Sequence, residues 1–430
     1  MPEGGLRARF AVLREVDRSI AILASISFIS NLGVSIMLPL LPLFAVQIGA
    51  TPGELGLMVS IFAVTQTVGQ LGSGAMINRV SPRRQMPLGQ ASYAAANFLI
   101  ATATSAVPLI AFRALAGLGG GLSIIAERLY IARVADRAKL AFTNGVVSAA
   151  GSSGSVLGPT IGAILAINLR VPFIVVGCTA TIAAIAAILF LPAEPAIVPG
   201  ARVSTALTPP PLPASTEDVP AIAAAVDTPR DIAVAPTPVT ASRWARIRPL
   251  FVLSLWNLAF SAAYGGWITT FGPYSTTNLG MSPGGVSLIF AAFGVGSILF
   301  GPPLARIADR SGRRRMVGAG SLLVLLFFGA ALLRAPLPVI YLVAALSGGG
   351  LAAAQSSWFA LLSVATDGAR RGRSFGYVTA LSNLGVIVGA SLASQVWEHV
   401  GLAEGMATAS IFLVLAALSL VFVPSDPKPR

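Results

Sequence analysis

Twelve long apolar runs constrain the fold of this chain more than any other feature. Each run is long enough to cross roughly 30 Å of hydrocarbon as a helix. Only helices and closed barrels satisfy their backbone hydrogen bonds in lipid, so we predict twelve membrane-spanning helices in two sets of six. The runs lie at about 19–45, 54–77, 86–106, 108–132, 142–167, 171–192, 249–274, 284–307, 316–333, 336–363, 374–397 and 402–423.

The composition agrees with a membrane protein. Of the 430 residues, 55% are hydrophobic and only 10% are charged, and the mean hydropathy is +0.81. Soluble globular domains carry about 25% charged residues. We therefore expect an all-α polytopic membrane protein with two six-helix repeats, the lipid bilayer as its surroundings, and a multi-pass location in the cell inner (cytoplasmic) membrane.

The positions of the basic residues indicate membrane topology and not nucleic-acid binding. The formal net charge is +13, but 26 of the 29 Lys and Arg fall in cytoplasmic segments if both termini are cytoplasmic. Arg170 and Arg334 lie in outer loops, and Arg113 lies within a span. This is a strong positive-inside bias. We predict cytoplasmic termini and no nucleic-acid partner.

The remaining composition gives no sign of a cofactor. Cys178 is the one cysteine and His399 the one histidine, so neither an intramolecular disulfide nor a metal-ligand cluster can be assembled from them. No small-residue cleavage site follows a short apolar core at the N-terminus, so we expect the first span to be retained as an anchor. We expect a monomer without metal or cofactor.

The two sets of runs are separated by a segment rich in Pro, Ala and Thr. Residues 193–247 contain ten prolines and no helical apolar period, which is typical of a flexible linker. We predict an N-terminal six-helix bundle at 1–192, this linker on the cytoplasmic side, and a C-terminal six-helix bundle at 248–430. WARIRPL, residues 244–250, is a candidate short interfacial helix before span 7.

An internal repeat relates the two halves at one constant offset in residue number. Pro42 and Pro273 are related by this offset. The same offset aligns an ordered series of residues without a gap: Gly49 with Gly280, Arg79 with Arg310, Gly117 with Gly348, Gly154 with Gly385, and Gly158 with Gly389. Such repeats are common in transporters, where an axis along the membrane normal relates two halves around a central cavity. The repeat predicts alternating access. Equivalent positions at which the two halves differ are informative, because the shared scaffold does not explain them. Examples are Arg113, which is equivalent to Ala344, and Glu127, which is equivalent to Trp358.

Two loops at equivalent positions of the repeat carry a shared motif. The second reads ARIADRSGRRR at 305–315 and the first GAMINRVSPRR at 74–84. Both resemble the loop signature of the major facilitator superfamily, in which Gly, Asp-Arg and a second Gly precede basic residues. Positive-inside charge alone explains the arginines but not this spacing. The resemblance implies gating loops at Gly74, Asn78, Arg79, Asp309, Arg310, Gly312, Arg313 and Arg314, with Asn78 replacing the usual Asp and Ala305 replacing the usual Gly.

Span 5 contains a small-residue motif. GSVLGPTIGA at 154–163 places Gly154, Gly158 and Gly162 on one helix face beside Pro159. Small residues at this spacing let two helix backbones approach closely, and the proline bends the helix. The motif resembles the span 5 motif of the superfamily's 12-span drug:proton antiporters, apart from Ala163 at a usual Gly. The resemblance implies efflux by antiport.

Span 4 contains two isolated charges. Arg113, followed by Gly117 and Gly119, resembles the family's span 4 pattern, in which the Arg is implicated in proton coupling. The alternative is that Arg113 extends to the outer interface. Glu127 lies fourteen residues later, or about 21 Å along the helix. It is either a second proton-coupling residue or the partner of Arg128 or Arg79 in an ion pair.

The resemblance also implies a substrate cavity lined by spans 1, 4, 7 and 10. Aromatic and amide side chains on these spans suit a small hydrophobic or amphipathic molecule. Trp267 is alternatively an interfacial anchor. Besides Arg113, the candidate residues are Asn31, Asn257, Tyr264, Trp267, Gln355 and Trp358.

Together these features favour a secondary transporter over an enzyme. We expect export of small hydrophobic or amphipathic compounds such as drugs, with the proton gradient as the energy source and no cofactor. Proton-linked uptake or exchange of a sugar or organic anion is an alternative, and a lipid scramblase is another. Because the sequence contains no Ser/His/Asp set, metal cluster or Walker loop, we do not expect enzymatic activity.

Overall fold

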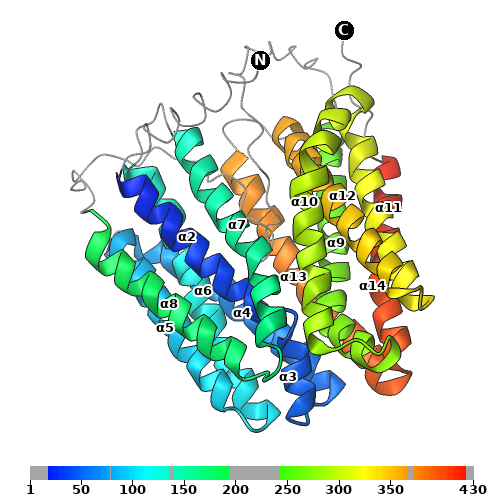
Figure 1. The fold of residues 1–430 in the computed structure, drawn as a ribbon. Coiled ribbons are helices and arrows are strands. Elements are labelled where there is room, and N and C mark those ends of the chain that lie inside the picture. The colour runs from blue at the N-terminus through cyan, green and yellow to red at the C-terminus, as the bar shows by residue number, and fades with distance from the viewer. Residues whose placement is uncertain (1–17, 78, 135–139, 193–242, 366–370, 423–430) are drawn as a thin grey trace, which may run out of the picture.

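The structure is a computed structural model that describes residues 18–77, 79–134, 140–192, 243–365 and 371–422. All regular secondary structure in these ranges is helical (Figure 1). The first half comprises α2 (Arg18–Met37), α3 (Leu41–Gln47), α4 (Pro52–Met76), α5 (Pro82–Thr102), α6 (Ala106–Val134), α7 (Leu140–Leu165) and α8 (Val171–Phe190). The second half comprises α9 (Arg243–Asn278), α10 (Pro283–Ser311), α11 (Arg313–Leu332), α12 (Leu337–Ala365), α13 (Arg371–His399), α14 (Leu402–Ser419) and the 3-10 turn η2 (Leu420–Phe422).

Ten of the described helices are long and apolar enough to cross a membrane. The helices α5 and α7 are not among the ten, although each is more than 18 residues long. Polar residues such as Arg83, Arg84, Gln85 and Gln90 lower the hydropathy of α5. The protein is thus a multi-pass helical membrane protein, while twelve spans and cytoplasmic termini stay predictions.

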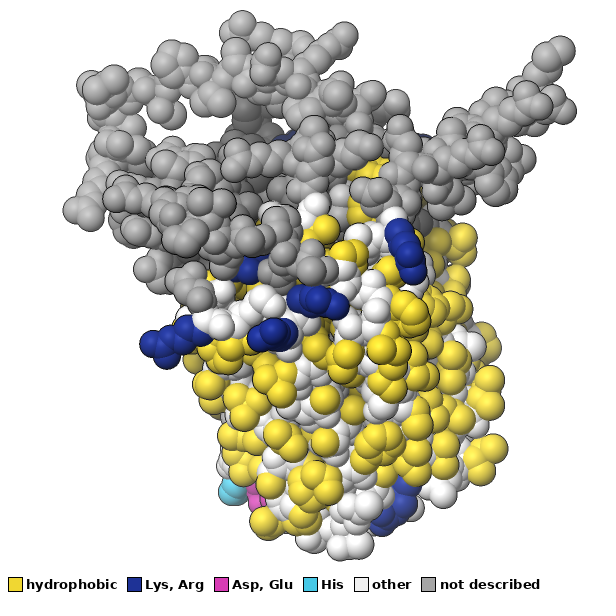
Figure 2. Space-filling view, turned by 90° about the vertical axis from the view of Figure 1, so that its left-hand side faces the viewer, with side chains coloured by type: hydrophobic (Ala, Val, Ile, Leu, Met, Phe, Trp, Pro, Cys, Tyr) yellow, Lys and Arg dark blue, Asp and Glu magenta, His cyan; other side chains and the backbone are white. Residues whose placement is uncertain are grey.

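The surface of the first half is typical of a membrane protein. Figure 2 shows apolar side chains over most of this face and arginines gathered toward the end where α2 starts. Exposed apolar residues on this half include Leu71, Ile164, Ile188 and Leu189. Contiguous apolar surface of this kind suits contact with lipid.

Two predicted boundaries differ from the structure. The run at 19–45 is broken, because α2 ends at Met37 and α3 begins at Leu41. Pro39 lies in this break, and proline disfavours a helical conformation in the residue before it and lacks a backbone donor. Residues 244–250 are not a separate interfacial helix, since α9 runs unbroken from Arg243 to Asn278. The last five residues of the predicted linker 193–247 are therefore helical, and the rest of it lies outside the described residues.

The repeat is present in the structure. The helices α10, α11, α12, α13 and α14 begin at positions 283, 313, 337, 371 and 402, and the helices α4, α5, α6, α7 and α8 begin at positions 52, 82, 106, 140 and 171. Every one of these five pairs of starts has the same offset as Pro42 and Pro273. Gly49 and Gly280, which are also equivalent, have positive φ values of 84° and 64°. Thr51 and Ser282 both cap the following helix by accepting a hydrogen bond from a backbone N–H. The same local geometry is therefore built twice.

Glycines let helices cross closely in both halves. A Cβ atom on Gly158 of α7 would lie 2.6 Å from Cβ of Ser35 and 2.8 Å from the carbonyl oxygen of Leu32, both on α2. A Cβ on Gly389 of α13 would overlap the carbonyl group of Ala262 on α9. These contacts leave no room for a side chain, as expected for small residues at a helix crossing. Within each half, the bundle is therefore assembled around the same tight helix pair.

The two halves meet along two helix pairs. The helix α4 packs against α13, and α7 packs against α10, with α3 also contacting α9. Ser60 on α4 hydrogen-bonds Ser391 on α13 at an Oγ–Oγ distance of 3.2 Å, and Asn383 Nδ2 donates to Thr67 Oγ1 at 2.8 Å. These hydrogen bonds connect the two bundles directly.

Apolar packing differs between the two ends of the bundle. At the end that carries α3, one large cluster joins both halves and includes Leu40, Phe44, Phe271 and Tyr274. The smaller clusters of the described residues each lie within one half: one contains Tyr130, and the other two belong to the second half. Among the described residues, the halves thus share an apolar cluster at the α3 end, and each half forms its own clusters at the opposite end.

Candidate functional site

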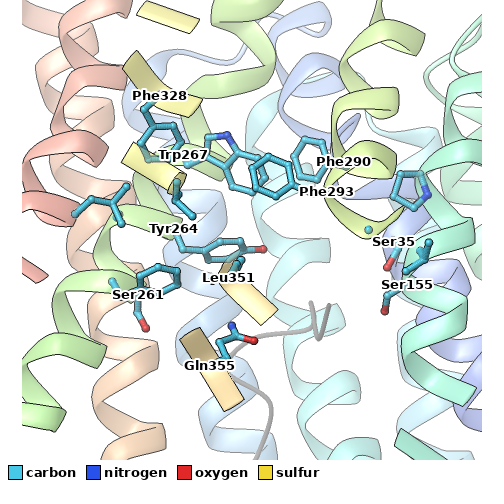
Figure 3. Close-up of a pocket in the computed structure, with 17 residues that line it drawn as sticks. Ser35, Ser155, Ser261, Tyr264, Trp267, Phe290, Phe293, Phe328, Leu351 and Gln355 are labelled. Carbon is cyan, nitrogen blue, oxygen red and sulfur yellow. The ribbon is translucent and has the colours of Figure 1, made fainter. Parts of the chain in front are cut away.

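An aromatic cavity lies between the halves, mainly against the second (Figure 3). It contains about 970 Å³ of space not filled by atoms, part of it open to solvent. Figure 3 shows its aromatic side chains facing Ser35 and Ser155 of the first half. Its main lining residues are Tyr264, Trp267, Phe290, Phe293, Phe328 and Gln355. With so few polar groups, this wall suits an apolar or aromatic ligand.

Trp267 is the centre of the aromatic wall. Its ring stacks on Phe290 at a centroid distance of 4.6 Å and contacts Phe293 at 5.7 Å and Phe328 at 6.5 Å. The side chain is only 8% exposed. An interfacial anchor would lie at the surface, so the alternative interpretation of Trp267 does not fit its position.

Arg113 lines a second, smaller cavity between the halves. This cavity, which we call the Arg113 cavity, is also lined by Phe62, Gln66, Tyr264 and Asn383. The Arg113 guanidinium carbon lies 4.0 Å from the centre of the Phe62 ring, a cation–π contact. The side chain is 4% exposed. It therefore lies inside the protein and does not extend to the outer interface.

Glu127 lines a third cavity, which lies mainly within the first half and has more polar lining groups than the aromatic cavity. Asn31, Gln66, Gln90 and Asn144 also line it. Gln90 Nε2 donates to the hydroxyl groups of Ser30 and Ser123, each at 2.9 Å. The Glu127 carboxyl interacts with the Ser27 hydroxyl and with Arg128. The structure therefore leaves both interpretations of Glu127 open, because this residue both lines a cavity and has a basic neighbour.

Two predicted cavity residues lie elsewhere. Asn257 is buried and donates to the carbonyl oxygen of Val378 at 3.2 Å and to the Ser382 hydroxyl, so it connects α9 to α13. The indole N–H of Trp358 donates to the carbonyl oxygen of Leu253 at 3.1 Å, within an apolar cluster. Neither residue lines the three cavities described above. Both have satisfied polar groups and pack between helices.

The predicted gating loops are described only in part. Asn78 and the side chains of Asp309 and Arg310 lie outside the described residues, so the acid positions of the motif stay predictions. Gly74 and Arg79 are exposed. Arg314 Nη2 donates to the carbonyl oxygen of Val421 at 3.1 Å, next to the end of α14. A positive charge is favourable at such a position, because the helix dipole is negative at its C-terminus.

The two loops also differ in backbone conformation. Gly312 has a φ of 100° and separates α10 directly from α11, which starts at Arg313. Ser81, at the equivalent position, has an ordinary φ of −64°, and α4 has already ended at Met76. In the first loop, where Ser81 replaces the second glycine, the connection between the helices is therefore longer. Five residues separate the end of α4 from the start of α5.

The span 5 motif lies on the face of α7 that packs against α2. Gly154, Gly158 and Gly162 each approach the α2 backbone too closely for a side chain. Pro159 lies inside α7 and lines the aromatic cavity. The motif thus connects a tight helix crossing to a cavity wall.

Several lining residues were not predicted from the sequence. Phe290, Phe293 and Phe328 form the aromatic wall, and Phe62 contacts Arg113. Phe290 and Phe293 are three residues apart and therefore share a helix face. A pair of phenylalanines in an apolar helix does not show by itself whether that face meets lipid, core or cavity.

Comparisons with known proteins agree with this architecture. The sequence model of the Major Facilitator Superfamily matches residues 23–276 and 255–430. The chain belongs to the major facilitator superfamily. The nucleoside transporter NupG, a solved structure, has a similar fold: the TM-score is 0.67 at 15% identity, with coverage of 94% of this chain and 98% of that chain. As a member of this superfamily, the protein is a membrane transporter.

Curated relatives match over a shorter region. The quinolone resistance protein NorA of Staphylococcus aureus is 26% identical over 177 residues, which is 41% of this chain and 46% of NorA. Multidrug resistance protein 2 of Bacillus subtilis is 26% identical over 171 residues, 40% of this chain and 43% of that protein. The chain therefore matches less than half the length of these relatives.

Proposed function

We propose that this superfamily member exports small hydrophobic or amphipathic compounds by proton-coupled antiport across a bacterial inner membrane. The aromatic cavity is the observation that carries the proposal. Its wall of Trp267, Phe290, Phe293 and Phe328 provides apolar surface, and Gln355 provides one of its few polar groups. A drug-sized molecule with an apolar body would bind such a wall by excluding water and stacking on its rings.

The similarity to NorA and to multidrug resistance protein 2 supports this class of substrate, since both names refer to resistance to drugs. The glycine–proline motif of α7 supports export, because it resembles the motif of the superfamily's antiporters and lies between α2 and the aromatic cavity. Both supports are independent of the cavity's composition.

The packing of the two halves supports alternating access. The halves share one apolar cluster at the α3 end and pack separately at the end where the arginines gather. With that basic end in the cytoplasm, this arrangement corresponds to a conformation open to the inside. Export then requires the α3 end to open while the opposite end closes.

Arg113 and Glu127 are the proposed coupling residues. Both lie on α6 and line cavities of the central region. A carboxyl group inside a membrane protein can bind a proton from one side and release it to the other as water access changes. Arg113, fixed over Phe62, supplies the positive charge whose surroundings change with the conformation.

Transport into everted vesicles tests the proposal. We expect an apolar fluorescent dye to accumulate inside acidified vesicles and to make the lumen more alkaline. Arg113→Ala and Glu127→Gln should each reduce accumulation about tenfold or more, because each removes a group whose interactions differ between the two states and couple them to the proton. If both variants accumulate the dye as well as the parent, the assignment of coupling residues is wrong.

Two assays separate the alternatives. Proton-linked uptake of a sugar or organic anion predicts transport in the opposite direction, with no accumulation of the dye in everted vesicles. A lipid scramblase predicts movement of labelled lipid in proteoliposomes without any ion gradient. Either result would replace export as the function of this chain.

A further inference from the structure

We propose that the Arg113 cavity binds the anionic group of the substrate, so that the transported compounds include amphipathic carboxylates. The inference rests on the proposed function, since it adds a polar end to the apolar molecule that the aromatic cavity accepts. It follows from unpaired donors on two side chains in one small cavity and from Tyr264, which lines both that cavity and the aromatic cavity.

Arg113 is a buried cation, and two of its three guanidinium nitrogens lack an acceptor within the ranges that the structure describes. Its Nε and Nη1 atoms have no hydrogen-bond partner among the described residues. It is also the one charged residue among the described residues that line its cavity. The ionisable groups that interact with it electrostatically are the phenols of Tyr93 and Tyr264, and a phenol is neutral near pH 7. No protein carboxylate in the described cavity lining balances the guanidinium.

A second donor in the same cavity is also unpaired. Gln66 is 3% exposed, and its Nε2 atom has no acceptor in the described part of the chain. Gln66 and Arg113 line the cavity together. Buried donors without acceptors are costly, and a buried charge without a partner is more so. A ligand that supplies acceptor oxygens would satisfy both side chains.

The repeat shows that the scaffold does not require this charge. Ala344 is the residue equivalent to Arg113 and is fully buried, so the corresponding place in the second half is filled by a methyl group. The cost of burying a guanidinium is therefore confined to one half. It lies where the two halves meet and not in a helix crossing that both halves share.

The chemistry of the donors indicates the kind of acceptor. A guanidinium presents a planar fork of N–H groups that matches the two oxygens of a carboxylate, and an amide N–H adds a further donor. The guanidinium carbon lies over the Phe62 ring, and the Nε and Nη1 donors have no acceptor among the described residues. A carboxylate fits this arrangement better than a cation or an apolar group.

The Arg113 cavity adjoins the aromatic cavity. Tyr264 lines both, and it contacts Trp267 with a ring-centroid distance of 5.9 Å. A molecule that spans both cavities would place its carboxylate at Arg113 and its ring system beside Trp267. The substrate class that fits both cavities is an aromatic or otherwise bulky apolar acid.

The test compares two probes of nearly the same shape, one anionic and one neutral. Binding of 2-naphthylacetate and of its neutral amide, 2-naphthylacetamide, is measured by calorimetry at pH 7 on the full chain in lipid nanodiscs. We expect the parent protein to bind the carboxylate about tenfold more tightly than the amide, which corresponds to about 1.4 kcal/mol. Equal affinities would overturn the proposal, and this comparison needs no substituted protein.

Substitutions then locate the preference. Arg113→Gln should weaken carboxylate binding about tenfold and change amide binding less than about twofold, since only the carboxylate uses the charge. Arg113→Lys should retain part of the preference. Arg334→Gln, which removes an exposed arginine outside the cavities, is the matched control and should change neither affinity. If Arg113→Gln weakens both probes equally, Arg113 has a structural role and the proposal fails.

One further variant separates this proposal from the proposed function. Trp267→Ala should weaken both probes by the same factor, because the ring system is common to them. A protein that binds both probes without preference for the carboxylate would contradict the anion site but leave the export of apolar compounds standing. A clear carboxylate preference without dye export in everted vesicles would support the anion site and contradict the proposed export of apolar compounds.

Discussion

The two halves of this transporter share their helix boundaries but differ in the chemistry that they present to the central region. In the second half, the cavity wall is made of Trp267 and phenylalanines on α10 and α11. In the first half, it includes many amide and hydroxyl groups, with Glu127 among them. Arg113 lies between these two regions. The duplicated scaffold is therefore equipped with an apolar side and a polar side.

This difference separates residues that maintain the fold from residues that select a ligand. Gly158 and Gly389 are equivalent and both lie at a backbone crossing, so their shared identity follows from packing. Trp267 stands where the first half has Ile36, and Arg113 stands where the second half has Ala344. Side chains present in one half only are not needed by the scaffold. They are the first places to look for function.

The largest expected effect comes from locking the halves together. Ser60 and Ser391 face each other across α4 and α13 with 3.2 Å between their Oγ atoms. In a Cys178→Ser background, the pair Ser60→Cys and Ser391→Cys should form a disulfide on oxidation, since cysteine pairs at such short range need little backbone movement. Oxidation should abolish dye accumulation and dithiothreitol should restore it.

The equivalent pair across α10 and α7 sharpens the comparison of the two interfaces. In the repeat, Ala291 is the position equivalent to Ser60, and Thr160 is the position equivalent to Ser391. If the halves rotate symmetrically, Ala291→Cys with Thr160→Cys should block transport in the same way. Full transport by a crosslinked protein, measured on the same vesicles with and without reductant, would contradict alternating access in this chain.

An intermediate effect is expected from adding one methyl group at each helix crossing. Gly158→Ala and Gly389→Ala should each lower the stability of the folded protein by about 2–3 kcal/mol, because the new Cβ atoms collide with α2 and α9. Thermal unfolding in detergent, followed by size-exclusion chromatography, measures the loss. Gly72→Ala, where a Cβ would meet nothing within 4 Å, is the control and should be neutral or stabilising. Similar melting temperatures for all three would refute the packing argument.

The smallest effect is expected at the two loops. Gly312→Ala should cost about 1–2 kcal/mol, because a φ of 100° is unfavourable for any residue with a side chain. Ser81→Ala should change the stability by less than about 0.5 kcal/mol, since Ser81 has an ordinary φ and makes no side-chain cap bond. Melting temperatures of the two variants show whether the loops differ as their backbones do. Equal shifts would mean that the glycine is not required for its conformation.

Much of the fold was predictable because it depends on patterns along the chain. Apolar runs located the long helices, and the constant offset between the halves correctly related the start of α4 to that of α10 and the start of α6 to that of α12. The break at Pro39 was missed because Leu38, Leu40 and Leu41 continue the apolar run on both sides of it. The length of α9 was missed because charged residues near Arg243 resemble a surface segment.

The site was less predictable because cavity lining depends on the rotation of each helix about its axis. Tyr264 and Trp267 are three residues apart and both face a cavity. Asn257 is on the same helix, yet its amide is used between α9 and α13. Helix positions can be read from the apolar pattern, but the direction of each side chain depends on its neighbours in space. The phenylalanines of α10 and α11 could not be separated from lipid-facing residues for the same reason.

The continuity of α9 has a mechanical consequence. At 36 residues, this helix is about 54 Å long, well beyond the roughly 30 Å of the hydrocarbon layer. Trp267 and Arg243 lie on the same helix, about 36 Å apart along its axis. A tilt of α9 as one body would therefore move the aromatic wall together with the start of the helix.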